Sequence, residues 1–185
     1  VRNYYNSTYY NEATKKWEDN PKGELFNIDP DTEYEYELAA NGAIKQRYKF
    51  MQYIYTQMFL SSKSGKPYIH PVFFDESHNS ALYAEPLEDS YMAGDALHVS
   101  TVLESSKTAK EYRSKFPTGN WILLSDFMNT KVEIKENANS FKFTPMIGDA
   151  TVHLKQGMAI PYQKDVVSVM STKQLMTRPS QFIVY

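Results

Sequence analysis

The sequence predicts two successive folds, an α/β part up to about Asp75 and an all-β part after it. A long amphipathic pattern ends at a glycine, and a short apolar run follows it directly. The second half consists of short alternating segments separated by turns. A helix followed by a buried strand is typical of an α/β barrel or a doubly wound sheet. Short alternating strands are typical of a β-sandwich.

Residues 1–31 are polar and rich in Tyr and Asn, which predicts a long irregular surface loop. A helix is then predicted over Thr32–Ser62, because Thr32 and Glu35 match a capping box. Apolar residues recur along one face of this helix, which we expect to be buried: Ile44, Tyr48, Met51, Tyr55 and Met58. Gly42 could interrupt the pattern and give two helices.

Gly65 ends the helix, and the apolar run Pro67–Phe74 follows it. This run is apolar on both faces, so it predicts a parallel strand covered on both sides. The later strands are predicted at Ala96–Leu103, Trp121–Leu124, Lys131–Lys135, Ser140–Thr144, Thr151–Leu154, Met158–Pro161 and Gln181–Tyr185. Several of them alternate with period two, as antiparallel strands with one buried face do.

The composition excludes several classes of protein. With 42% hydrophobic and 15% aromatic residues, the chain can build a core and is not expected to be disordered. The net charge of −2 gives little support to a nucleic-acid coat or a polybasic membrane binder. No apolar run approaches the roughly 20 residues of a membrane helix. The absence of Cys excludes disulfides, thiolate metal sites and a cysteine nucleophile.

The sequence offers few local motifs of catalysis. The four histidines are scattered, which favours core or surface roles over a metal site. There is no glycine-rich phosphate loop and no Gly-x-Ser-x-Gly elbow. The adjacent carboxylates Asp75-Glu76 and Glu88-Asp89 are more consistent with solvated charges than with the separated pair of a glycosidase.

Two features of the N-terminal region concern processing. Asn6-Ser7-Thr8 is an N-glycosylation sequon, which favours the secretory pathway and makes Asn6 the candidate acceptor. The chain starts with Val1 and has no signal-peptide pattern, so we interpret it as a mature or truncated piece.

A set of motifs follows in order along the chain: Arg2-Asn3, Arg47–Thr56, Gly65–Phe74, Gly94–Leu103, Phe116–Trp121 and His153–Pro161. Their order resembles glycoside hydrolase family 31, the α-glucosidase family. Arg47–Thr56 is similar to the family's Arg-Tyr-x-Leu-Leu-Pro-Tyr-Leu-Tyr-Thr helix, and Gly65–Phe74 to its Gly-x-Pro-x-x-Arg-Pro-Leu-Phe strand. Further segments resemble family motifs in the same order: Arg2-Asn3, Gly94–Leu103, Phe116–Trp121 and His153–Pro161. The resemblance covers almost the whole chain. It implies the last part of a (β/α)8 catalytic barrel over residues 1–90, closed by the 65–74 strand, and a proximal C-terminal β-sandwich over residues 91–185.

The resemblance also implies a retaining, exo-acting α-glucosidase as the parent protein, acting on terminal α-linked glucose. In this family both catalytic aspartates precede the segment that Arg2-Asn3 resembles, so this chain would carry no catalytic residue and would be inactive alone. Arg2 and Tyr4 are the candidate substrate-binding residues. The expected partners are an α-glucoside and the rest of the same polypeptide, or a companion chain, that completes the barrel. No metal or other cofactor, no nucleic acid and no membrane span are expected.

Departures from the family pattern leave alternatives open. Tyr4 stands where the family has a sugar-binding His, and His70 stands where it usually has Arg. The parent could therefore be a non-catalytic structural or interaction protein derived from an inactivated glucosidase. A stand-alone carbohydrate-binding β-sandwich is a further alternative, although the apolar helix argues against it. For an active parent we expect lysosomal or secreted localisation, with the endoplasmic reticulum also possible.

Overall fold

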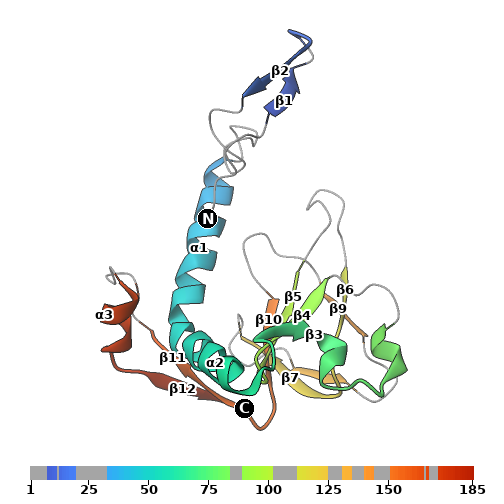
Figure 1. The fold of residues 1–185 in the computed structure, drawn as a ribbon, viewed down its shortest axis with the longest axis vertical. Coiled ribbons are helices and arrows are strands. Elements are labelled where there is room, and N and C mark those ends of the chain that lie inside the picture. Colours follow the sequence, from blue (N-terminus) through green and yellow to red (C-terminus); the bar gives the residue numbers. More distant parts are fainter. Residues whose placement is uncertain are drawn as a thin grey trace. The chain divides into compact units, whose positions relative to one another are not determined.

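The computed structural model describes residues 8–11, 13–19, 33–83, 89–101, 112–124, 131–134, 140–143, 151–164, 166 and 171–185. The chain divides into two compact units, Val1–Gly42 and Ala43–Tyr185. Figure 1 labels the elements of both.

The first unit contains a β-hairpin that the sequence analysis missed. Strands β1 (Thr8–Asn11) and β2 (Lys16–Asp19) pair antiparallel, with Tyr10 opposite Trp17. Lys15 adopts a positive φ of 53° where the turn meets β2. The expectation of an irregular loop over residues 1–31 is therefore wrong for this part.

The predicted helix is present as two helices, α1 (Glu33–Lys49) and α2 (Met51–Ser64). The break falls at Phe50 and not at Gly42, which lies within α1. Its cause is tertiary, because the Lys49 carbonyl accepts the amide N–H of Gln163 and the Phe50 ring packs on Tyr162. Gly65 ends α2 with a φ of 79°, as expected.

The buried face of α2 differs from the predicted one. Of the five predicted residues only Met51 is buried, whereas Ile44, Tyr55 and Met58 are exposed. The face that contacts the core instead carries Phe50, Tyr53 and Ile54. The apolar periodicity was correct, but α2 is apolar on two sides, and periodicity alone does not tell which one is covered.

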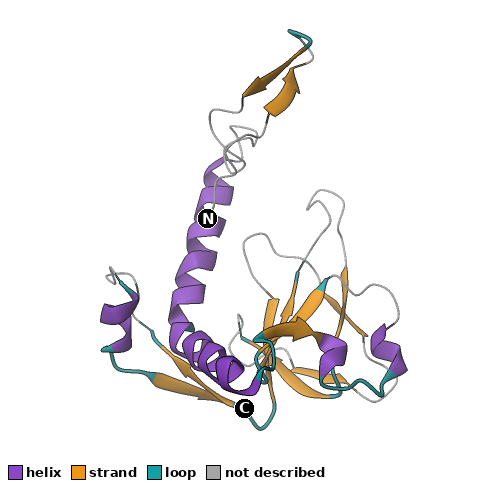
Figure 2. Ribbon diagram, viewed as in Figure 1, coloured by secondary structure: helices purple, strands orange, loops and turns teal. Residues whose placement is uncertain are grey.

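A six-stranded antiparallel sheet forms the centre of the second unit, in the order β3-β4-β5-β10-β7-β8. Its strands are β3 (Ile69–Pro71), β4 (Ser90–Ala93), β5 (Leu97–Ser100), β7 (Gly119–Leu123), β8 (Lys131–Ile134) and β10 (Thr151–Lys155). Figure 2 shows that strands dominate the chain after α2. The antiparallel all-β part is thus confirmed, while the barrel portion stays a prediction.

The strand at β3 corrects one expectation. Ile69 pairs with Ala93 and Pro71 with Tyr91, so β3 runs antiparallel at the edge of this sheet and is not a parallel barrel strand. The apolar sequence of Pro67–Phe74 predicted a strand buried on both faces. Of the three residues of β3, however, only His70 is buried. Pro71 fits an edge strand, where the missing N–H does not interrupt a ladder. The predicted boundary at residue 90 is not tested by this pairing and stays a prediction.

Two shorter antiparallel pairs accompany the sheet. Strand β6 (Tyr112–Lys115) pairs with β9 (Ser140–Phe143), and β11 (Ala159–Tyr162) pairs with β12 (Gln181–Val184). The short helix α3 (Thr172–Met176) is capped by the Ser171 hydroxyl, which accepts the amide N–H of Gln174. Strands β4 and β6 were not expected from the sequence.

Both faces of the sheet are covered. On one face, Leu97, Ile122 and Leu154 form a core with Tyr53 of α2 and Ile160 of β11. On the other face, Met92 and Trp121 pack with Phe116 and Phe141, the latter from β9. The arrangement is a layered β-sandwich whose first face is completed by a helix.

Candidate functional site

The predicted substrate-binding residues Arg2 and Tyr4 and the candidate glycosylation site Asn6 lie outside the described residues. Their roles stay predictions. The groups that could bind a ligand or carry out chemistry are therefore considered among the described side chains.

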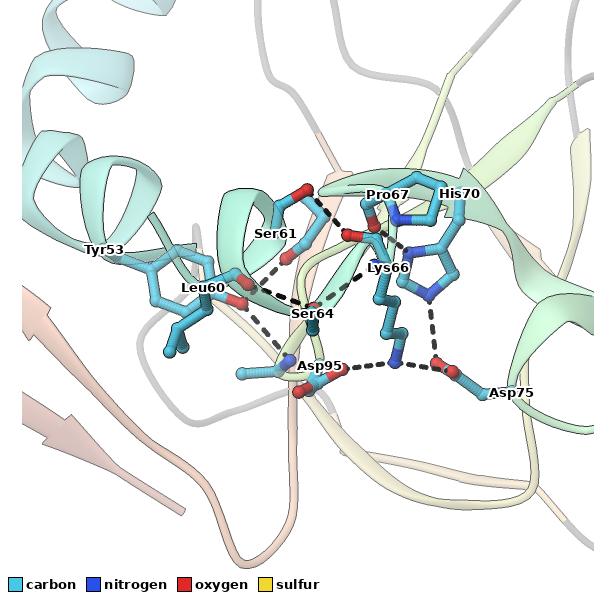
Figure 3. A network of polar contacts seen from close by, with 11 residues as sticks. Tyr53, Leu60, Ser61, Ser64, Lys66, Pro67, His70, Asp75 and Asp95 are labelled. Atoms are coloured by element: carbon cyan, nitrogen blue, oxygen red, sulfur yellow. Dashed lines mark hydrogen bonds and ion pairs between the residues drawn. The ribbon is translucent and has the colours of Figure 1, made fainter. Parts of the chain in front are cut away.

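The most extensive polar cluster joins the end of α2 to β3 and to the β4–β5 turn (Figure 3). The Lys66 Nζ lies 2.7 Å from Asp75 Oδ1 and 2.6 Å from Asp95 Oδ1. The other oxygen of Asp75 lies 3.0 Å from His70 Nε2, and His70 Nδ1 lies 3.0 Å from the Pro67 carbonyl oxygen. We call these four side chains, Lys66, His70, Asp75 and Asp95, the Lys66 clasp.

The electrostatics of the Lys66 clasp favour its ionised form. Partial burial opposes ionisation of Asp75, but hydrogen bonds from Lys66 and His70 outweigh it and hold the pKa of Asp75 below its usual range. Desolvation likewise opposes the charge of Lys66, but the two carboxylates outweigh it and raise the pKa of Lys66. Each charge in the cluster is therefore stabilised by an opposite one.

This geometry does not suit acid/base catalysis. A retaining glycosidase needs two carboxyl groups about 5–5.5 Å apart, one of them protonated, with a sugar between them. Asp75 and Asp95 are instead separated by one lysine ammonium, and the pKa of Asp75 is lowered. Both nitrogens of His70 are already engaged, so the ring cannot activate a nucleophile. The clasp is a structural element.

Glu76 is also engaged, contrary to the expectation that Asp75-Glu76 is a solvated charge pair. The carboxylate of Glu76 accepts the Thr118 amide N–H at 2.8 Å and the Thr118 hydroxyl at 3.0 Å. It thereby joins the loop after β3 to the turn before β7. Sequence adjacency gave no sign of this, because the partner is 42 residues away.

Three of the four histidines are buried in the same sheet, as the core reading predicted. His70 is opposite Met92, Met92 opposite His98, and His98 opposite His153. Burial lowers the pKa of His98 to about 3, and the nearby His153 adds to the effect. The His98 Nε2–H donates to the Lys115 carbonyl, and the ring stacks on Phe116 with centroids 3.8 Å apart. His98 is therefore a neutral core residue.

Within the part of the chain that the structure describes, no group of three or more His, Cys, Asp or Glu side chains could hold a metal ion. Among the same residues, no helix is long and apolar enough to cross a membrane.

Residues 65–160 match the family model of the glycosyl hydrolase family 31 C-terminal domain. The chain belongs to glycoside hydrolase family 31. The match begins at Gly65, directly before β3, and ends within β11. The matched residues therefore include the six-stranded antiparallel sheet. The sandwich thus corresponds to the C-terminal region of family 31 proteins.

Similar proteins of this family are much longer than the chain. Alpha-xylosidase 1 of Arabidopsis thaliana is 25% identical over 164 residues, which are 89% of this chain and 16% of that protein. The alpha-glucosidase of Hordeum vulgare is 28% identical over 140 residues, 74% of this chain and 15% of that protein. The chain thus spans about one sixth of the length of these relatives.

Solved structures agree with the fold. A GH31 dextranase of Flavobacterium johnsoniae superimposes with a TM-score of 0.69 at 20% identity, over 86% of this chain and 18% of the other. A GH31 alpha-xylosidase from a soil metagenome gives a TM-score of 0.59 at 18% identity, over 80% of this chain and 20% of the other. At this identity the likeness concerns the fold alone.

Proposed function

We propose that the chain is part of a retaining, exo-acting α-glucosidase that releases terminal α-linked glucose from oligosaccharides or glycans. The observation that carries the proposal is the family 31 match over residues 65–160. An alpha-glucosidase of Hordeum vulgare is among the similar proteins, which is consistent with the proposed specificity. In this reaction one carboxylate attacks the anomeric carbon, and a second protonates the leaving oxygen and then activates water.

In this proposal both catalytic aspartates belong to a larger protein, and the chain contributes binding and support. The described carboxylates Asp75 and Asp95 are tied to Lys66, which agrees with a supporting role. Arg2 would donate hydrogen bonds to sugar hydroxyls, and Tyr4 would hydrogen-bond or stack on a sugar face. No metal or organic cofactor is required by this chemistry.

The rest of the same polypeptide, or a companion chain, would complete the catalytic barrel against α2. The outer face of α2 exposes Tyr55, Met58 and Phe59, each by 55–58%, at the helical spacing i, i+3, i+4. A helix with apolar residues on two sides is normally buried on both. We place the start of the sandwich near Gly65, where the family match begins, instead of after residue 90.

The sequon at Asn6 supports an N-glycosylated protein of the secretory pathway, lysosomal or secreted. Treatment of the natural protein with an N-glycan-specific amidase would reduce its mass if Asn6 carries a glycan. Substitution of Asn6 by Gln would reduce that shift by the mass of one glycan.

The proposal is tested by assaying the natural full-length protein with 4-nitrophenyl α-glucoside and with the matching α-xyloside, because both specificities occur among its relatives. We expect preferred hydrolysis of the glucoside with initial release of the α-anomer, and no hydrolysis by the 185-residue chain alone. Hydrolysis confined to the xyloside would refute the glucosidase assignment. No hydrolysis of either would favour the non-catalytic alternative that Tyr4 suggests.

A second test concerns the sugar pocket. Tyr4→Ala should raise KM for the glucoside by about 5- to 30-fold, since a lost stacking or hydrogen-bonding contact weakens binding by about 1–2 kcal/mol. Tyr9→Ala, five positions along the chain, serves as the matched control. Equal kinetics of both variants would exclude Tyr4 from the pocket.

A further inference from the structure

The two-stranded ribbon of β11 and β12 has one covered and one exposed face (Figure 1). Side chains alternate between the two faces along each strand. The covered face carries Ile160 and Ile183, which pack into the core together with Tyr53 of α2. The exposed face carries two pairs of opposed residues, which we call the outer ribbon face: Ala159 with Val184, and Pro161 with Phe182.

The outer ribbon face is apolar and almost fully accessible. Phe182 is 68% exposed and Val184 is 70% exposed, the two largest values among the large hydrophobic side chains that the structure describes. Isolated exposed apolar residues are common, but apolar residues gathered on one face mark an interaction surface. The outer ribbon face is therefore expected to have a partner.

The outer edge of β12 also offers unpaired backbone groups. The Tyr185 N–H donates to the Met158 carbonyl oxygen at 3.1 Å, so the backbone of Tyr185 points towards the neighbouring strand. Backbone groups alternate in direction along an antiparallel strand. Those of Phe182 and Val184 therefore point away from β11. Pro161, which lies opposite Phe182 and has no N–H, agrees with this register.

Strand β12 lacks the usual protection of an exposed edge. Natural proteins protect such edges with charged side chains, proline or bulges, because unpaired backbone groups otherwise promote aggregation. The four residues of β12 are Gln-Phe-Ile-Val, without a charge or a proline. Among the described strands, β12 pairs only with β11. We therefore expect another strand to occupy this edge in the natural protein.

The ribbon is held in place from its covered side. The Gln163 N–H, directly after β11, donates to the Lys49 carbonyl oxygen at 2.9 Å. The Ser180 hydroxyl, directly before β12, donates to the Gln52 side-chain oxygen on α2. Both strands are thus fixed against the helices, and a partner strand would meet a preformed edge at a low cost of ordering.

The comparisons favour one source for that strand. The match to the family 31 C-terminal domain ends at Ile160, so β12 lies beyond the domain that the family model describes. The matched relatives are about six times longer than the parts that this chain covers. The natural protein would therefore supply further chain to this side of the ribbon.

We propose that a strand of the natural full-length protein, from outside residues 1–185, pairs with the free edge of β12 and covers the outer ribbon face. Its backbone satisfies the outward N–H and C=O groups of Phe182 and Val184, and its alternate apolar side chains pack on their side chains. The outer ribbon face differs from the outer face of α2, because α2 packs on the covered side of the ribbon. The proposal depends on the length of the natural protein and not on its enzymatic activity.

Hydrogen–deuterium exchange of the natural full-length protein, read by mass spectrometry at single-amide resolution, tests the pairing directly. Ile183 is the internal reference, because its N–H points towards β11 and is protected in any case. We expect the amides of Phe182 and Val184 to exchange at least about a hundredfold more slowly than in an unfolded chain, as Ile183 does. Protection of Ile183 alone would show that the edge is free and would overturn the proposal.

A second copy of the protein could also pair with this edge, and dilution distinguishes the two sources. A strand of the same polypeptide protects Phe182 and Val184 equally at every protein concentration, and in a protein that sediments as a monomer. Protection that disappears as the protein is diluted to the monomer assigns the edge to a second copy and contradicts the proposal.

A pair of variants tests the outer ribbon face. Phe182→Asp in the natural full-length protein should lower the melting temperature by several degrees and increase exchange at Val184 at least about tenfold, because it places a charge in the covered face. Gln181→Asp is the matched control, since Gln181 is an exposed neighbour whose side chain points to the opposite side of the ribbon. Equal effects of the two variants contradict the proposal. The exchange measurement on the unaltered protein decides the case if Phe182→Asp does not fold.

Discussion

At the residue scale, two buried histidines of the same sheet have different surroundings. His70 faces two acceptors, whereas His98 donates once to the Lys115 carbonyl and stacks on Phe116. Desolvation without a counter-charge lowers the pKa of His98 to about 3, helped by the nearby His153. The environment, and not the residue type, decides which form is stable.

His98 makes the protein sensitive to acid. Its pKa lies below the unfolded value of about 6.5, so the unfolded state binds the proton more readily and stability falls as pH drops below 6.5 towards 3. We expect a loss of about 2 kcal/mol between pH 7.5 and pH 5. Urea unfolding at the two pH values measures it. His98→Asn should reduce this loss, and His78→Gln, at an exposed histidine, should not.

Gly94 is required by a close contact as well as by its backbone. It has a φ of +66°, and an added Cβ would lie 2.5 Å from the Tyr53 hydroxyl oxygen. We expect Gly94→Ala to destabilise the fold by about 2–4 kcal/mol. Gly42→Ala, inside α1 with open space around it, should instead stabilise by about 0.5–1 kcal/mol. Thermal unfolding of both variants tests the contrast, and a neutral Gly94→Ala contradicts it.

At the scale of elements, one tyrosine joins α2 to the sheet. The Tyr53 hydroxyl donates to the Ala93 carbonyl at 2.7 Å and accepts the Ala96 amide N–H at 3.2 Å. Burial, the largest cause, raises the pKa of Tyr53 above its usual range. Ala93 ends β4 and Ala96 directly precedes β5, so the helix fixes the turn between these strands.

Tyr53→Phe should destabilise the fold by about 1–3 kcal/mol, because it leaves a buried carbonyl and a buried amide without their partner. Tyr55→Phe on the exposed side of the same helix should change stability by less than about 0.5 kcal/mol. Denaturant unfolding measures both. Equal effects would mean that the Tyr53 contacts do not hold the helix.

At the scale of the whole molecule, the exposed apolar face of α2 predicts a covering domain. Met58→Asp should lower the melting temperature of the natural full-length protein by several degrees, because it buries a charge in the proposed interface. Thr56→Asp, exposed on the same helix, is the control and should have little effect. Differential scanning calorimetry measures both melting temperatures. Equal melting temperatures of the two variants would mean that the outer face of α2 is exposed to solvent in the full-length protein.

Much of this architecture follows from sequence pattern. The helical region, its end at Gly65 and most of the later strands were predicted, because periodicity and glycine conformations are local properties. The break at Phe50 was missed, since it depends on Gln163, which lies more than 100 residues away. The edge position of β3 was missed for the same reason.

The candidate site was likewise predictable from the sequence only in part. The order of motifs indicated the family, and the match over residues 65–160 confirmed it. No sequence signal identified the Lys66 clasp, because Asp95 approaches Lys66 only after β3 and β4 pair. The roles of Arg2 and Tyr4 rest on resemblance alone, since those residues lie outside the described part of the chain.

By itself, the sequence determined the classes of element and the family, because both depend on short-range residue patterns that persist in any context. The tertiary structure alone decided which side of α2 is covered, the direction of β3, and the neutral state of His98. These properties depend on the distances between groups far apart in the chain, and the strength of desolvation and charge pairing depends on those distances.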